Sequence, residues 1–145
     1  MHVLTLAPKL RKGQANKLEG KYMDFIVSDK ALSDVFVVSE LDLVGALGWT
    51  ENKAYESGQL DQFLGIKAPE LKTGRISFYV CPMCSDIGCG AITARIEITD
   101  NAVIWKDFGY ETNYSEPQLT EYQHIGPFIF EKEAYKKILE EIRPE

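Results

Sequence analysis

Three stretches in the middle of the chain decide its fold: RISFYVC at residues 75–81, GAITARIEI at residues 90–98 and AVIWKDF at residues 102–108. Apolar and polar side chains alternate along the first two stretches, and a period of two residues is typical of half-buried strands. The residues between the second and third stretches, Thr-Asp-Asn at 99–101, tolerate the geometry of a tight turn. The pattern predicts an antiparallel meander of three strands.

The segment that follows the meander predicts a covering helix. Residues 131–142 place their apolar side chains on one helical stripe, and Pro144 prevents extension of the helix. We expect this amphipathic helix to cover one face of the sheet. Residues 127–130 can add an edge strand just before it.

The N-terminal half predicts shorter elements. Residues 2–6 and 22–27 have strand character, with a loop or a weak helix over residues 10–19. Ser39 is a candidate N-cap for a short helix that ends at Gly48, and a second short helix ends at Gly65. Apolar residues at helical spacing mark both helices: Leu41, Val44 and Leu47 in the first, and Leu60, Phe63 and Leu64 in the second. The predicted fold class is α+β, in a single domain over residues 1–145.

Length and composition exclude several classes. A chain of 145 residues suits one domain, and it contains no run of about 18 apolar residues that could cross a membrane as a helix. The first eight residues are too short and too polar-flanked for a signal peptide, which indicates the cytoplasm. Three cysteines clustered within nine positions agree with a reducing compartment.

Charge is distributed unevenly along the chain, whose net charge is −6. Residues 1–23 are basic, whereas residues 107–131 contain five carboxylates and no lysine or arginine. An acidic protein is a poor binder of nucleic acid, because the phosphate backbone attracts cations. We therefore expect a basic protein as partner, and neither a nucleic acid nor a membrane.

The turn between the first two central strands carries all three cysteines, Cys81, Cys84 and Cys89. Thiolates at C-x-x-C spacing can bind one zinc ion, with Cys89 as a third ligand and His124 as the best fourth, His2 being the other candidate. The spacing resembles the start of a zinc knuckle but departs from it, since Cys89 stands where the knuckle has histidine. One structural zinc is therefore one interpretation, and no cofactor is the other.

Two further interpretations of this turn remain open. Cys81-Pro-Met-Cys84 is similar to the C-P-x-C of thiol oxidoreductases, but that motif works at a helix N-terminus and the strand pattern resumes within nine residues. Alternatively, the cysteines are small buried hydrophobic residues, and Gly88 and Gly90 shape a turn or a bulge.

The acidic stretch interleaves tyrosines with carboxylates, a composition that suits a protein interface. A tyrosine ring supplies rigid apolar area and a hydroxyl, while carboxylates steer a basic partner and pair with its arginines. The opposing interpretation is a solvated loop whose tyrosines cover the edge of the core. The predicted partner-binding residues are Asp107, Tyr110, Glu111, Tyr114, Glu116, Glu121 and Tyr122.

The sequence contains no complete catalytic signature. There is no G-x-G-x-x-G or Walker pattern, and no serine lies in G-x-S-x-G. Glu111, Glu116, Glu121 and His124 could carry acid/base chemistry, but nothing in the sequence defines their mutual geometry. We predict a non-catalytic protein, with a zinc-stabilised domain of possibly enzymatic role as the alternative.

Three motifs resemble those of a family of small bacterial proteins. They are YVCPMCSDIGCGAIT at residues 79–93, W-x-D-F-x-Y at residues 105–110 and H-x-G-P-x-x-F at residues 124–130. The resemblance covers residues 75–140, with a weaker likeness at residues 24–34. It implies a fold-sized unit and no particular activity.

The general profile is also similar to the immunity proteins of bacterial contact-dependent toxin systems. Those proteins are small, acidic and cytosolic, and they neutralise toxin domains that are often basic nucleases. This likeness implies a cognate toxin domain as the partner, bound through the acidic, tyrosine-rich stretch.

Overall fold

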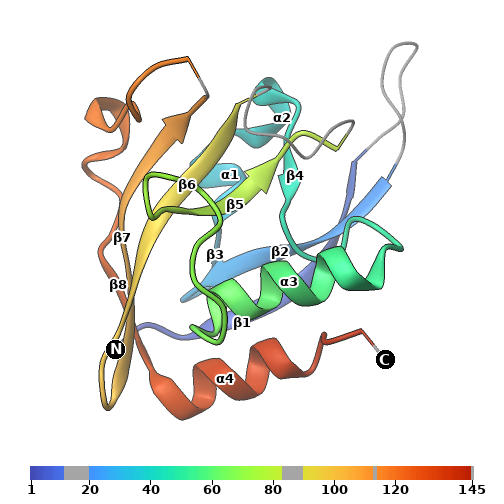
Figure 1. Cartoon of the computed structure of the whole chain (residues 1–145), viewed down its shortest axis with the longest axis vertical. Coiled ribbons are helices and arrows are strands. Elements are labelled where there is room, and N and C mark those ends of the chain that lie inside the picture. Colours follow the sequence, from blue (N-terminus) through green and yellow to red (C-terminus); the bar gives the residue numbers. More distant parts are fainter. Residues whose placement is uncertain (12–19, 83–89, 113, 145) are drawn as a thin grey trace.

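The computed structural model describes residues 1–11, 20–82, 90–112 and 114–144, and it shows the predicted α+β class. Two antiparallel sheets form the framework, one with the order β1-β2-β3 and one with the order β4-β5-β6-β7-β8 (Figure 1). The strands are β1 (Leu4–Arg11), β2 (Gly20–Val27), β3 (Lys30–Ala31), β4 (Val44–Gly45), β5 (Ile76–Val80), β6 (Ala91–Ile98), β7 (Ala102–Glu111) and β8 (Phe128–Glu131). The helices are α1 (Leu32–Val35), α2 (Val38–Leu41), α3 (Lys53–Phe63), α4 (Lys132–Glu140) and the short 3-10 helix η2 (Thr120–Tyr122).

The predicted meander is confirmed as β5, β6 and β7, which are neighbours in the larger sheet. The turn between β6 and β7 is closed by a hydrogen bond of 2.9 Å from the Thr99 amide to the Ala102 carbonyl. β7 runs beyond the predicted end at residue 108, because Ala91 at the start of β6 pairs with Glu111. β8 is confirmed as the edge strand next to β7.

The two sheets meet at both edges, so that together they curl around one core. The His2 amide donates to the carbonyl of Ile129 in β8 at 2.8 Å, and the Met23 amide of β2 donates to the Leu47 carbonyl after β4 at 2.9 Å. Figure 1 shows the N-terminus beside β8. A strand edge that is covered in this way does not offer its backbone to other chains.

The predicted C-terminal helix is confirmed as α4, which packs against the strands through Tyr135 and Leu139. The Tyr135 hydroxyl accepts a hydrogen bond from Trp105 Nε1 at 3.1 Å and donates one to the Phe63 carbonyl at 2.7 Å. These bonds connect α4 to the sheet and to α3, which runs beside α4 in Figure 1. Burial raises the pKa of Tyr135, so its hydroxyl remains neutral.

The predicted helix between Ser39 and Gly48 is wrong. α2 ends at Leu41, Asp42 takes a left-handed conformation with φ 57°, and Val44–Gly45 then pairs with β5 as β4. Every residue from Leu43 to Leu47 is buried, and Gly45 among them has no side chain. A continuous buried run is typical of a strand segment and not of one face of a helix. The second predicted helix is confirmed as α3, whose N-cap Asn52 accepts from the Tyr55 amide at 3.0 Å.

The predicted loop or weak helix over residues 10–19 is partly wrong. Leu10 and Arg11 belong to β1, where they pair with Lys21 and Gly20 of β2. Residues 12–19 lie outside the described part of the chain. Among the described residues, no helix has the length and the apolar character needed to span a bilayer.

Candidate functional site

The cysteine turn is described only in part. Cys81 follows β5, is half-buried and packs against the core, whereas Cys84 and Cys89 lie within residues 83–89, outside the described part of the chain. His124 is exposed in the segment between η2 and β8. The described ranges contain no group of three or more His, Cys, Asp or Glu side chains that could hold a metal ion. The zinc interpretation therefore stays a prediction.

The zinc interpretation has a direct test. If Cys81, Cys84 and Cys89 bind zinc, protein purified without chelator should contain one equivalent of the metal, and EDTA should lower its melting temperature. Elemental analysis and thermal melting measure the two quantities. Substoichiometric zinc together with unchanged melting in EDTA would exclude a structural zinc.

The glycine that closes the cysteine turn has a definite structural role. Gly90 has φ +91°, and a Cβ atom there would overlap the Tyr110 hydroxyl. Only glycine combines this backbone conformation with such a close approach. Gly90 thus allows Tyr110 of β7 to lie over the start of β6.

Residues 107–122, which we call the acidic segment, leave the sheet at the end of β7 and return beside it. Tyr110 and Gln118 exchange backbone hydrogen bonds of 3.0 and 2.8 Å, so the described residues between Glu111, the last residue of β7, and Gln118 form an excursion away from the sheet. η2 follows this excursion, and its Tyr122 ring packs against Phe36 with the ring centroids 5.8 Å apart. Both ends of the excursion are therefore anchored on the domain.

The acidic segment exposes four of the seven predicted partner-binding side chains. Tyr114 is 85% exposed, and Glu116 and Glu121 are also exposed. Asp107 is exposed as well, while Tyr110 and Tyr122 are half-buried. Within the described residues, Asp107, Glu116 and Glu121 form no ion pair. The structure therefore brings an unpaired tyrosine and three unpaired carboxylates to the surface of one segment.

Glu111 is the exception, and its assignment to a partner-binding surface is corrected. Its side chain is 5% exposed and forms an ion pair with Arg75, whose side chain is 2% exposed, at 3.3 Å. Glu111 lies with Arg75 and Thr93 on the face of the sheet opposite to Tyr110, which packs against the hydrophobic core. Glu111 therefore stabilises the fold and is not available to a partner.

Both members of this buried ion pair have further hydrogen-bond partners. The Glu111 carboxylate accepts from the hydroxyls of Thr73 and Thr93, each at 3.0 Å. The Arg75 guanidinium donates to the Thr93 hydroxyl and carbonyl, each at 2.8 Å, and to the Asp107 carbonyl. Burial lowers the pKa of Arg75, and the nearby Glu111 carboxylate opposes that effect. This network ties β5, β6 and β7 together beneath the acidic segment.

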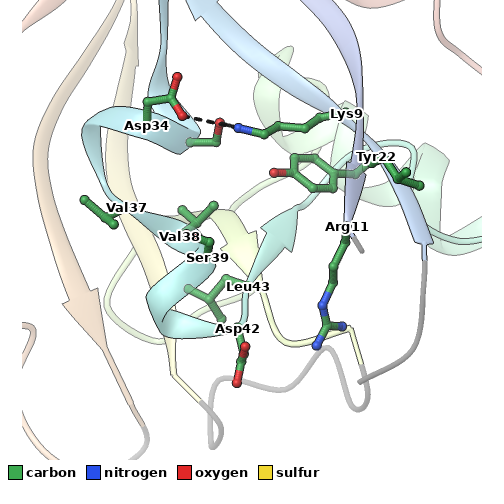
Figure 2. Close-up of a pocket in the computed structure, with 11 residues that line it drawn as sticks. Lys9, Arg11, Tyr22, Asp34, Val37, Val38, Ser39, Asp42 and Leu43 are labelled. Carbon is green, nitrogen blue, oxygen red and sulfur yellow. Dashed lines mark hydrogen bonds and ion pairs between the residues drawn. The ribbon is translucent and has the colours of Figure 1, made fainter. Parts of the chain in front are cut away.

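A second buried polar cluster lies between the two sheets, and no sequence pattern indicated it. The Asp24 carboxylate accepts from the Tyr79 hydroxyl at 2.6 Å and from the Ser33 hydroxyl at 2.5 Å. The Lys9 ammonium donates to the Ser33 hydroxyl at 2.7 Å and forms an ion pair with Asp34 at 3.3 Å. Figure 2 shows Lys9 reaching toward Asp34. The cluster therefore reaches from the core to the wall of a pocket.

Tyr22 lies beside this cluster and should make stability depend on alkaline pH. Burial, followed by the Asp24 carboxylate, raises the pKa of Tyr22 from 10.0 to about 12. Because the folded-state value is the higher one, this stabilisation is complete below the unfolded-state pKa and is lost as the pH rises through about 12.

The expected size of this effect is about 2 kcal/mol of unfolding free energy between the two pKa values. Urea unfolding between pH 10 and about 12 measures this effect. Over that range, the free energy of unfolding of Tyr22→Phe should fall by that amount less than that of the unmodified protein. An equal decline in both proteins would show that Tyr22 does not carry the effect.

Comparison of the chain with protein-family models, with curated proteins and with solved structures finds no match. The function must therefore be argued from the chemistry and the geometry of the described surfaces.

Proposed function

We propose that this protein is a non-catalytic binding domain that docks a basic protein partner through its acidic segment. The observation that carries this proposal is Tyr114, a large aromatic side chain that is 85% exposed in a segment whose Asp107, Glu116 and Glu121 carboxylates are also exposed. Tyrosine is enriched among the residues that dominate binding energy, because its ring and hydroxyl both gain contacts on docking.

The charges of the segment support a basic partner. Asp107, Glu116 and Glu121 are exposed, and the segment has no lysine or arginine to neutralise them. Such carboxylates increase the rate of encounter with a cationic surface and can pair with its arginines. The similarity in profile to immunity proteins gives the class of partner, a toxin domain such as a nuclease, which the bound protein would neutralise.

The anchoring of the excursion also supports docking. The paired backbones of Tyr110 and Gln118, and the packing of Tyr122 on Phe36, fix where the exposed residues lie before a partner arrives. A preorganised surface loses less conformational entropy on binding than a free loop does.

The experiment is coexpression with the product of the adjacent gene in the native host. We expect this protein to restore growth if that product is toxic, and the two proteins to copurify. Isothermal titration should show that Tyr114→Ala weakens the complex by about 2 kcal/mol, which is roughly thirtyfold. Glu116→Lys and Glu121→Lys should slow association, and more so at low salt than at high salt.

The matched control is Glu51→Lys, which reverses an exposed charge in the loop before α3. It should leave both affinity and association rate unchanged. The acidic segment would be excluded as the docking surface if Tyr114→Ala and both charge reversals bound the partner as tightly as the unmodified protein does. Failure to protect cells from any neighbouring toxic product would exclude the immunity role.

A further inference from the structure

A pocket of about 390 Å³ opens between the β1–β2 hairpin and the segment that contains α1 and α2. Figure 2 shows Lys9, Tyr22 and Arg11 along one side, with Val38, Ser39 and Leu43 facing them. A volume of this size lies within the range of small-molecule sites, which extends from about 300 to 1,000 Å³. The described residues that line the pocket include none of the acidic segment.

One cation of the pocket is already held in place, whereas the other is not. Lys9 donates to Ser33 and pairs with Asp34, and Ser33 is itself held by the buried Asp24. The guanidinium of Arg11 forms no ion pair or hydrogen bond with any side chain in the described ranges. A half-buried, unpaired guanidinium is a donor that matches a planar carboxylate through two parallel hydrogen bonds.

The wall across from Arg11 combines the aliphatic side chains of Val38 and Leu43 with the polar side chains of Ser39 and Asp42 (Figure 2). Val38 and Leu43 line the pocket and are buried, while Leu10 and Val37 contribute partly exposed apolar surface. Among the described residues of the wall, the other charged ones are Asp34 and Asp42, whose formal charges balance those of Lys9 and Arg11. Such a pocket disfavours a multivalent anion such as a nucleotide, and it suits a single carboxylate that is attached to an apolar body.

The backbone around α2 is strained at two residues that line this pocket. Val37 and Asp42 immediately flank the helix, and they have φ values of 50° and 57°. The left-handed region is unfavourable for a β-branched residue such as valine. Strained residues of this kind concentrate at ligand-binding sites, where the surrounding structure holds them.

We propose that this pocket binds a small monocarboxylate with an aliphatic body. The Arg11 guanidinium pairs with the ligand carboxylate, and Val38 and Leu43 contact its aliphatic part. Ser39, also in the wall, can accept a hydrogen bond from a polar group between the two.

The test uses N-acetyl-leucine, which has one carboxylate and one branched aliphatic side chain, and N-acetyl-leucinamide, which lacks the carboxylate. In a nuclear magnetic resonance titration of the full chain, N-acetyl-leucine should shift the backbone amides of Leu10, Val38, Ser39 and Leu43. The dissociation constant should be about 1 mM, as ordinary ligand efficiencies allow for a molecule of this size. The amide should bind at least about tenfold more weakly, because a charge-assisted pair is lost.

Two variants test the pocket in different ways. Arg11→Gln should weaken binding of N-acetyl-leucine at least about tenfold, whereas Arg95→Gln, on an exposed position of β6, should not alter it. Ser39→Leu should block the pocket while retaining Arg11. The same spectra show whether each variant is folded. The proposal would be overturned if N-acetyl-leucine did not shift the amide resonances of the pocket residues. It would also be overturned if the two ligands bound equally well, or if Arg11→Gln bound N-acetyl-leucine with unchanged affinity.

Discussion

Replacement of Glu111 by alanine is expected to lower the free energy of unfolding by about 3 to 5 kcal/mol, the usual cost of breaking a buried ion pair. The change would leave the Arg75 guanidinium charged and 2% exposed, without its counter-ion. It would also remove the acceptor of the Thr73 and Thr93 hydroxyls. Urea unfolding followed by circular dichroism measures this loss.

The matched control is Glu116→Ala, which removes an exposed carboxylate from the same segment. Its effect on stability should stay within about 0.5 kcal/mol, as for most surface substitutions. A double replacement, Arg75→Met with Glu111→Leu, should recover part of the stability lost in Glu111→Ala, because no buried charge is then left unpaired. If Glu111→Ala and Glu116→Ala cost the same, Glu111 is not a buried, paired carboxylate in solution.

Replacement of Trp105 by alanine is expected to cost about 3 to 5 kcal/mol, as large truncations in a core do. The Trp105 ring lies 4.7 Å from the rings of both Phe78 and Phe130 and 5.5 Å from that of Phe25, between centroids. It therefore contacts both sheets, and its Nε1 donates to Tyr135 of α4. Loss of the ring would open a cavity where the two sheets and the C-terminal helix meet.

Tyr135→Phe separates the hydrogen-bond part of this effect from the packing part. This variant retains the ring but leaves the Trp105 Nε1 and the Phe63 carbonyl without the hydroxyl they share. We expect a cost of about 1 to 3 kcal/mol, which is smaller than that of Trp105→Ala. The chain has two tryptophans, so emission from a Trp49→Phe variant reports on Trp105 alone. A central packing role for Trp105 would be contradicted if Trp105→Ala lowered the free energy of unfolding no more than Tyr135→Phe does.

The meander and the C-terminal helix could be predicted because their signals are local. Alternation over residues 90–98, a short turn at residues 99–101 and one apolar stripe over residues 131–142 each appear within a single window of sequence. The helix predicted after Ser39 failed for the opposite reason. Its apolar residues fit a helical period, but β5 presents a free edge with which Val44 pairs, and that partner lies more than 30 residues away.

The candidate surface could be predicted in composition but not residue by residue. The sequence predicted an acidic, tyrosine-rich segment, and Tyr114, Glu116 and Glu121 are indeed exposed in it. It could not show that Glu111 is buried, because that depends on its ion pair with Arg75 in the folded protein. The pocket could not be predicted either, since Arg11 and Leu43 become its two walls only when the β1–β2 hairpin packs beside α2.

By itself, then, the sequence determined the α+β class, the central meander, the covering helix and the uneven charge, since these follow from periodicity and composition within short windows. Only the tertiary structure decided that Glu111 is buried, that the two sheets curl around one core, and that Arg11, which has no ion pair with a described residue, lines a pocket together with Val38 and Leu43. The physical reason is that burial and charge pairing are properties of contacts between residues distant in the chain. Glu116 is a candidate for docking and Glu111 forms a buried ion pair although both are carboxylates, so only their surroundings distinguish the two.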